Sequence, residues 1–443
     1  MERVLEKRKF LKMFWPVLIE QSLSVIVGIV AALMLRSISS AAMAGVGLLS
    51  VVNILMLNAF SAIASGVNVV VSQCVGAKNR TLAGKVTGQS ILLCLYLSIF
   101  MGTFMAVLSR PVLGLLFPGA EEPVLNAAAI YLRYMAGSLP FQALFALTAG
   151  ILRANGNTKT PMKSSLIGNA SFLTVSALGI FVFNLDVHGA GLGFAFSRIV
   201  MASIIVIQLY KIRKKLEIPP LGLKLDYSIL RRVFKIAIPA GIDSLIYNIG
   251  KLILNMFKSG MGTVVLEANA IVVNLANFVY MPFVILSTIT VPLVGQSWGA
   301  GEFRQARRRA FILVLVSSTM QIALLAIFLL LPGHGINFFR PGEETFTVAR
   351  AAFLICLFAA VPVGALGYVL PQALRASGDV KYVMYVSMTS MIVMRIFMSW
   401  VLGVHFDMRL TGIWIASILD WSTRAVFFTA RAINLHKRGK QVI

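Results

Sequence analysis

The sequence predicts an all-α integral membrane protein, built from about twelve transmembrane helices in two parallel six-helix repeats. Three observations lead to this fold class: the composition, the alternation of charge between loops, and a repeat at half the chain length. Hydrophobic residues make up 58% of the 443 residues and charged residues only 13%, whereas soluble domains carry about 25% charged residues. The mean hydropathy of +0.86 therefore indicates that lipid surrounds most of the chain.

Apolar runs long enough to cross a bilayer as a helix alternate with short polar turns. Because lipid offers the backbone no hydrogen-bond partners, helices are the structure expected in these runs. Two runs, 46–73 and 265–296, are long, and we expect each to be one helix, since a break would put a basic loop on the wrong side of the membrane. The predicted helices are 14–35, 46–73, 86–108, 124–152, 161–183, 190–210, 230–257, 265–296, 309–331, 346–374, 382–403 and 411–433.

Lysine and arginine concentrate in alternate loops, and the turns between those loops hold only single basic residues. Positive loops stay in the cytoplasm. We therefore expect a multi-pass protein of the plasma (inner) membrane with both termini cytoplasmic. The net charge of +24 reflects this orientation and does not indicate a nucleic-acid partner, because the basic residues flank the apolar runs.

The second half of the chain repeats the first half. "GILRANGNTKTP" and "QALRASGDVKYV" share Leu-Arg-Ala-x-Gly, and Arg153 and Arg375 are 222 residues apart (375 − 153). Pro16 and Pro239 are 223 apart (239 − 16), and "VSQCVGA" recurs as "VGQSWGA" at that offset. Six crossings return the chain to its starting side, so the repeats share one orientation. Parallel repeats with a substrate path between them are typical of transporters.

The repeat predicts three parts of the chain. An N-lobe, 1–215, holds the first six helices, and a C-lobe, 230–443, holds the second six. The linker, 216–229, contains two prolines, and its surroundings are basic, as expected of a cytoplasmic connection. We expect the chain to act as a monomer.

The duplicated arginine motif is predicted to be a structural feature of the cytoplasmic face. In each half a long helix ends at the arginine, Arg153 or Arg375, and a glycine that suits the following turn, Gly156 or Gly378, comes three residues later. The arginines are expected to anchor the helix ends near backbone carbonyls and lipid phosphates.

Taken together and in order, these motifs resemble the multidrug and toxic-compound extrusion (MATE) family of bacterial transporters. The resemblance also rests on "VVVSQCVGAKN", "VPLVGQSWGAG" and "IPAGIDSLIYNIGKLIL", and it covers nearly the whole chain. It implies two six-helix lobes around a central cavity and the export of organic, often cationic compounds, coupled to inward Na⁺ or H⁺ movement without a cofactor. Many members carry an aspartate late in the first helix, and the aligned residue here is Ala31. The usual N-lobe acid for cation coupling is therefore missing.

Embedded acids are the first candidates for ion coupling, because a charge inside the bilayer costs about 2.5–3.5 kcal/mol on insertion scales. Glu20 and Asp243 each follow a proline, Pro16 or Pro239, by four residues. Proline leaves an upstream carbonyl unpaired and favours a bend, so both prolines are predicted hinges. In one interpretation the two acids line the cavity and bind cations or protons. In the other they neutralise basic residues at the inner surface.

Other polar residues lie on helices that would line the cavity. Tyr247 and Lys251 share a helix face with Asp243, but Lys251 lies about 12 Å of rise away from the acid. We therefore expect Lys251 to meet a polar group on another helix. Asp420 and Arg424, four residues apart, are expected to form an ion pair. Polar packing between helices is the alternative to cavity lining. The predicted substrate-cavity residues are Gln21, Asn53, Tyr247, Asn248, Lys251 and Asn274.

The sequence carries no enzyme or metal motif. The three cysteines and four histidines are scattered, and His-Glu-x-x-His and the P-loop do not occur. A polytopic membrane enzyme would need a cluster of Asp, His or Ser at one membrane face, and none is found.

The sequence therefore predicts a secondary-active multidrug exporter, surrounded by membrane lipids, that moves lipophilic organic cations against H⁺ or Na⁺ by alternating access. The alternative is a lipid or lipid-linked oligosaccharide flippase of related architecture. Such a flippase would need a cavity rich in arginine, and the embedded Arg198, Arg395 and Arg424 keep this alternative open.

Overall fold

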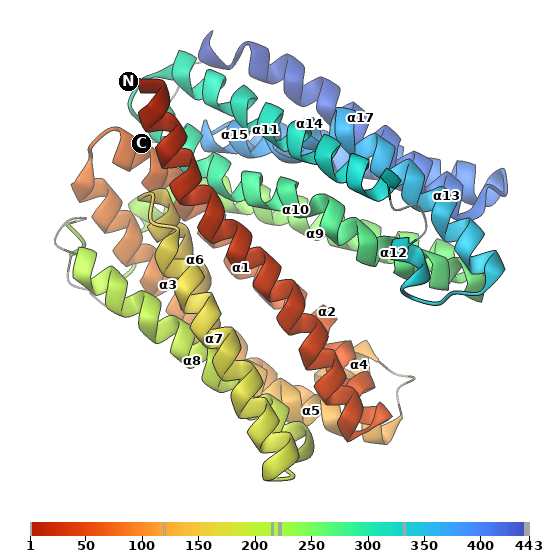
Figure 1. Cartoon of the computed structure of the whole chain (residues 1–443). Helices are drawn as coiled ribbons and strands as arrows, with labels where there is room; N and C mark the ends of the chain where they lie inside the picture. Colours follow the sequence, from red (N-terminus) through yellow and green to blue (C-terminus); the bar gives the residue numbers. More distant parts are fainter. Residues whose placement is uncertain are drawn as a thin grey trace. The chain divides into compact units, whose positions relative to one another are not determined.

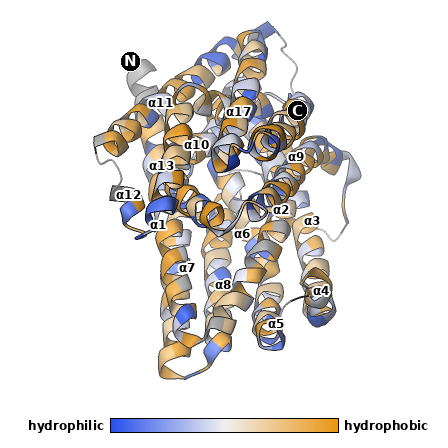
Figure 2. Cartoon of the chain, turned by 90° about the vertical axis from the view of Figure 1, so that its right-hand side faces the viewer, coloured by the Kyte–Doolittle hydropathy of each residue, from blue (hydrophilic) through white to orange (hydrophobic). Residues whose placement is uncertain are grey.

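The described part of the chain is almost entirely helical (Figure 1). A computed structural model describes residues 2–117, 119, 121–213, 217–219, 224–330 and 334–437, and these residues contain no strand. The predicted all-α membrane fold is confirmed. Hydrophobic residues occur along most of the length of the helices (Figure 2), including the less apolar α7 (Lys159–Ala177).

The apolar helices match the predicted membrane crossings. By length and composition, ten helices of the described residues can each cross a membrane, and the pair α5 (Glu122–Gly137) and α6 (Leu139–Ala154), bent by 52°, raises this number to eleven. α17 (Arg409–Ile433) occupies the last predicted segment but is not among them. Both long predicted segments are single helices of 37 residues, α2 (Ser40–Gly76) and α10 (Thr263–Gly299), so the prediction that neither segment is split is confirmed.

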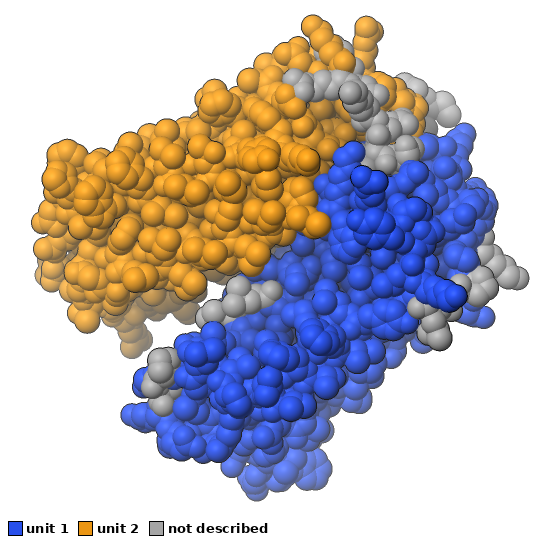
Figure 3. Space-filling model, turned by 180° about the vertical axis from the view of Figure 1, so that it is seen from behind, with its two compact units in different colours: residues 1–237 blue, residues 238–443 orange. Residues whose placement is uncertain are grey.

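The chain forms two compact units, Met1–Ala237 and Ile238–Ile443, which we call unit 1 and unit 2 (Figure 3). In unit 1, α7 packs along α8, and α2 packs against α5 and α6. The elements of unit 1 are α1 (Glu2–Ile38), α2, α3 (Arg80–Val107), α4 (Ser109–Leu116), α5, α6, α7, the π-helical turn η1 (Leu178–Val182) and α8 (Asp186–Ile212).

Unit 2 begins within α9 (Tyr227–Ser259). In this unit α10 packs against α11 and α13, and α17 packs against α13. The elements after α9 are α10, α11 (Phe303–Leu330), α12 (His334–Asn337), α13 (Glu343–Ala359), the π-helical η2 (Ala360–Gly364), α14 (Ala365–Tyr368), α15 (Leu370–Ala376), α16 (Val380–Ser390), the π-helical η3 (Met391–Phe397) and η4 (Trp400–His405), α17, and the 3-10 turn η5 (Leu435–Lys437).

Proline marks an equivalent interruption in each repeat. The bend between α5 and α6 lies next to Pro140, and Pro362, 222 residues later (362 − 140), lies inside η2. Proline removes a backbone hydrogen bond and is a common cause of such breaks. Pro16 and Pro239, in contrast, lie inside the unbroken helices α1 and α9.

The connection between the repeats is fastened to α3. The Thr81 hydroxyl donates to a Glu217 carboxylate oxygen at 2.6 Å. The Gln89 amide donates to the Lys224 carbonyl at 3.2 Å and accepts from the Asp226 backbone N–H at 2.8 Å. The described residues of the predicted linker therefore lie against unit 1, and residues 216 and 220–223 lie outside the described residues.

Asp226 begins the helix that leads into unit 2. Its carboxylate accepts from the backbone N–H of Ser228 at 2.9 Å and from the Ser228 hydroxyl at 2.6 Å. The hydroxyl bond, which favours the charged form, lowers the pKa of Asp226. The carboxylate therefore stays ionised and caps the exposed N–H groups at the start of α9.

The glycines of the duplicated motif form the turns that the sequence predicts. Gly156 and Gly378 have φ values of +80° and +91°, a conformation that is costly for other residues. In both turns the residue after the glycine donates its N–H to the carbonyl five residues earlier, at 2.9 and 3.0 Å. This bond satisfies a carbonyl at the helix end, as in a Schellman turn.

Replacing Gly156 with alanine should lower the free energy of unfolding by about 1 kcal/mol, because a side chain is strained in the left-handed region. No neighbouring atom lies within 4 Å of the position of the new Cβ, so backbone strain is the whole effect. Thermal unfolding in detergent measures it. Gly114→Ala in α4, also with free space around the Cβ, is the matched control and should be neutral or slightly stabilising. Equal stability of the two variants would contradict the turn assignment.

Candidate functional site

The embedded acid of unit 1 is held by the arginine of the duplicated motif. Arg153 on α6 donates from Nη2 to both carboxylate oxygens of Glu20 on α1, at 2.7 and 2.9 Å. The Ser165 hydroxyl on α7 donates to the same carboxylate at 3.3 Å. The side chains of Glu20 and Arg153 are only 7% and 17% exposed, so this is a buried ion pair that joins three helices.

Unit 2 repeats this arrangement. Asp243 on α9 forms an ion pair with Arg375 on α15, and the side chain of Ser387 on α16 lies next to the same acid. The two acids are 223 residues apart (243 − 20), the arginines 222 (375 − 153) and the serines 222 (387 − 165). The same three-residue set therefore occurs once in each unit.

Sequence reasoning found the acids and the arginines, and one of its two interpretations paired the acids with basic residues at the inner surface, but it did not name these arginines as the partners. The arginines were expected near backbone carbonyls and lipid phosphates, whereas their carboxylate partners lie on another helix of the same unit. Ser165 and Ser387 were not identified as site residues, although their separation of 222 residues (387 − 165) matches the repeat and could have indicated them. The Nε atoms of Arg153 and Arg375 are buried without a hydrogen-bond partner, so each guanidinium keeps an unused donor.

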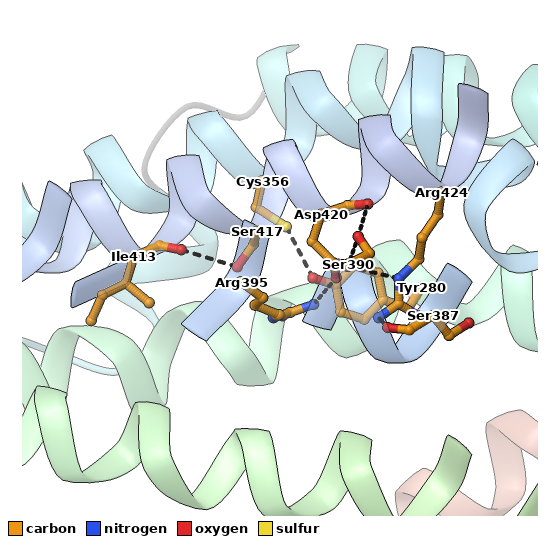
Figure 4. A network of polar contacts seen from close by, with 9 residues as sticks. All are labelled: Tyr280, Cys356, Ser387, Ser390, Arg395, Ile413, Ser417, Asp420 and Arg424. Carbon is orange, nitrogen blue, oxygen red and sulfur yellow. Dashed lines mark hydrogen bonds and ion pairs between the residues drawn. The ribbon is translucent and has the colours of Figure 1, made fainter. Parts of the chain in front are cut away.

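A second buried ionic group lies in unit 2 (Figure 4). Asp420 on α17 is fully buried and accepts from Arg424 Nε at 2.7 Å, from Arg395 Nη1 at 3.2 Å and from the Ser390 hydroxyl at 2.6 Å. The predicted pair between Asp420 and Arg424 is confirmed, but Arg395 and Ser390 were not predicted as partners. Arg395 comes from the π-helical η3, and π-helical turns are frequent at functional sites.

Tyr247 lies beside two cations. Lys251 Nζ is 5.3 Å and the guanidinium carbon of Arg395 is 6.0 Å from the centre of its ring. Among the described residues Lys251 forms no ion pair within 4.0 Å with Asp243, in line with their separation along α9. The contact found for Lys251 is thus with an aromatic ring on its own helix.

The remaining predicted cavity residues make contacts within their own units. The Asn53 carbonyl oxygen accepts from the Gln142 amide at 3.4 Å, and Gln21 is half-buried on α1. The amides of Asn248 and Asn274 donate to backbone carbonyls four residues earlier, at 2.7 and 2.9 Å. Among the described residues, none of these four side chains hydrogen-bonds with Glu20 or Asp243.

Unit 1 contains an apolar cavity of about 300 Å³ at the position where the family aspartate is expected. Ala31, Tyr131 and Ser176 lie in its wall, and none of the described residues lining it carries a carboxylate. Arg198 on α8 stacks 4.6 Å from the centre of the Phe194 ring and has no carboxylate within 4.0 Å among the described residues. Across all the residues that the structure describes, no three His, Cys, Asp or Glu side chains lie close enough together to hold a metal ion.

Apolar spanning helices, a half-chain repeat and matching buried ion pairs define a membrane protein of the transporter class. More particularly, the chain belongs to the MatE family, whose model matches residues 16–177 and 239–401, two stretches that begin 223 residues apart (239 − 16). The family model thus matches once in each of the two repeats. Members of this family are transporters, which points away from an enzyme.

Similar proteins match nearly the full length of the chain. The chain is 26% identical to the uncharacterized transporter YisQ of Bacillus subtilis (strain 168), over 94% of this chain and 92% of that protein. It is 26% identical to the probable multidrug resistance protein NorM of Thermotoga maritima, over 100% and 97% of the two chains. A crystal structure of MATE in the bent conformation has the same fold, with a TM-score of 0.88 at 16% identity, covering 98% and 97%.

Proposed function

We propose that this protein is a secondary-active exporter of lipophilic organic cations, an antiporter driven by H⁺ or Na⁺ that works by alternating access of its two lobes, 1–215 and 230–443. Relatives named multidrug resistance proteins support the export of small organic compounds. The basic alternate loops support an orientation in the plasma membrane with both termini in the cytoplasm. The protein would act as a monomer.

The observation that carries this proposal is the duplicated set of acid, arginine and serine. Glu20 and Asp243 are embedded carboxylates, and each is bound by an internal cation, Arg153 or Arg375. A coupling ion or a cationic substrate that binds either acid must compete with that guanidinium. Binding of a proton removes the negative charge that holds the arginine. The acids thereby link ion binding to contacts between helices, as antiport requires.

Pro16 and Pro239 lie one helical turn before the two acids. Each removes a backbone hydrogen bond from its helix, so α1 and α9 would bend there more easily than elsewhere. Such a bend would move each acid relative to the arginine on the neighbouring helix. We assign the cavity wall to the remaining polar residues, Gln21, Asn53, Tyr247, Asn248, Lys251 and Asn274.

The test is dye efflux from proteoliposomes, with a pH gradient and a Na⁺ gradient applied separately. Glu20→Gln and Asp243→Asn keep the shape of the side chains and remove the charge. Both variants should lose gradient-driven efflux of a cationic dye, with the larger loss for Asp243→Asn. Glu344→Gln, which removes an exposed carboxylate at the start of α13, should transport like the parent protein. Native rates in both acid variants would show that the acids only neutralise neighbouring basic residues.

A further inference from the structure

A group of basic side chains lies at the start of α11. Arg304 and Arg308 are exposed and four residues apart, so they share one face of the helix. Arg307 donates from Nη1 to the Ile433 carbonyl at the end of α17, at 2.9 Å. The next turn of the chain, η5, packs against α11, and its exposed Lys437 adds a cation from a second element. We call these three arginines and the lysine the basic surface.

The charge of the basic surface is not balanced inside unit 2. Its three exposed cations, Arg304, Arg308 and Lys437, have no carboxylate within 4.0 Å among the residues that the structure describes. The acid just before the helix, Glu302, is exposed and supplies one negative charge for the four positive ones. Cations this close repel one another, and cations at the start of a helix are also disfavoured by the helix dipole. An anion from outside the chain would relieve both costs.

The equivalent surface of unit 1 is balanced by the chain itself. Thr81 and Lys85 on α3 occupy the positions of the two exposed arginines, 223 residues earlier (304 − 81 and 308 − 85). The linker lies against them, since the Thr81 hydroxyl donates to the Glu217 carboxylate and the charge of Lys85 acts on Asp226. After the last helix of unit 2, the sequence 434–443 holds basic residues and no Asp or Glu. The repeat therefore provides acids for this surface in unit 1 and none in unit 2.

The exposed face of α11 continues from the arginines as an apolar surface. Ile312 and Leu315 follow Arg308 by about one and two helical turns and are 42% and 67% exposed. Phe303–Leu329 is long and apolar enough to cross a membrane, so the arginines at its start lie where lipid headgroups begin. At the position of Ile312, α3 carries Gln89, which hydrogen-bonds with the linker. A charged end followed by exposed apolar side chains matches a lipid headgroup followed by its acyl chain.

We propose that the basic surface binds the phosphate group of an acidic phospholipid. The guanidinium groups of Arg304 and Arg308 donate paired N–H groups to the phosphate oxygens, and Lys437 adds a point charge. The acyl chain lies along Ile312 and Leu315. The bound lipid thereby holds η5 and the end of α17 against α11. This site is separate from the buried pairs of acid and arginine, so the failure of either proposal leaves the other standing.

The test is lipid binding to the full-length protein in a mild detergent, followed by native mass spectrometry. Dioleoylphosphatidylglycerol is compared with dioleoylphosphatidylcholine, which has the same acyl chains and a headgroup without net charge. The parent protein should bind the acidic lipid at least about tenfold more tightly. Arg304→Gln and Arg308→Gln should each weaken its binding about fivefold. Arg308→Lys keeps the charge and should retain most of the affinity. Equal binding of the two lipids by the parent, or parent-like binding by both glutamine variants, would overturn the proposal.

Lys85→Gln is the matched control, because it removes the exposed lysine at the repeat position of Arg308, where Asp226 of the chain already supplies the negative charge. It should leave lipid binding unchanged. Equal weakening by Lys85→Gln and Arg308→Gln would mean that the lipid responds only to net charge, and no site would remain. Glycerol 1-phosphate, which has no acyl chain, should bind at least about tenfold more weakly than the lipid. Equal affinity would assign the basic surface to a soluble phosphate and refute the lipid site.

Discussion

Replacing Asp420 with asparagine is expected to lower the free energy of unfolding by about 3–5 kcal/mol. Asp420 is fully buried and is the shared carboxylate partner of Arg395 and Arg424. Asparagine keeps the shape and can still accept a hydrogen bond from Ser390, but it leaves two embedded guanidinium groups without a counter-charge. Unfolding in detergent, followed by tryptophan fluorescence, measures the loss.

Two further variants show whether the effect is one of charge. Asp407→Asn makes the same chemical change in a pair whose side chains are 79% and 59% exposed, and it should leave stability unchanged because exposed pairs contribute little. The triple variant Asp420→Asn, Arg395→Gln and Arg424→Gln should be more stable than Asp420→Asn alone, since it removes the unpaired charges. If Asp420→Asn has the same free energy of unfolding as Asp407→Asn, then Asp420, Arg395 and Arg424 do not form an ionic group that is shielded from water.

The second large effect is expected at the ion pair of unit 1. Arg153→Gln leaves Glu20 buried without its cation, and Glu20→Gln leaves Arg153 without its anion. Each change should cost about 3 kcal/mol, as is typical when one partner of a buried pair is removed. The double change Glu20→Gln with Arg153→Gln should cost less than the sum of the two, with a coupling free energy of about 2 kcal/mol. Unfolding of the four proteins in one detergent gives this double-mutant cycle.

A matched cycle on Arg110 and Glu122 supplies the control. These side chains are also in unit 1 and lie 3.4 Å apart, but they are 65% and 68% exposed, so their coupling should be at most a few tenths of a kcal/mol. Exchange of the two charges, Glu20→Arg with Arg153→Glu, should recover part of the stability without recovering transport. Equal coupling in the two cycles would mean that burial does not strengthen the pair between Glu20 and Arg153.

Much of the fold follows from local properties of the sequence. The lengths of the apolar runs predict the helices, and α2 and α10 are the single long helices that the loop charges required. The turn glycines were predictable as well, because only glycine adopts the φ values found at 156 and 378 without strain. The π-helical turns were not predictable, since their extra backbone residue depends on packing with neighbouring helices and leaves no clear pattern in composition.

The candidate site was predicted less completely. An acid and an arginine four residues apart on one helix face each other, so the pair between Asp420 and Arg424 could be inferred from spacing. Arg395 lies 25 residues from Asp420 and comes from another element. Its approach depends on the π-helical register of η3, which no spacing rule describes.

By itself the sequence determined the membrane environment, the order and duplication of the helices, and the residue types embedded in each repeat. Hydropathy, loop charge and repeat offset are properties of the chain alone, so they need no knowledge of contacts. Only the tertiary structure decided that the acid and the arginine of each repeat form a pair. Glu20 meets Arg153 across 133 residues, and Asp243 meets Arg375 across 132. Such pairs form where the packing of separate helices brings the two charged groups together inside the protein, away from competing water and lipid headgroups.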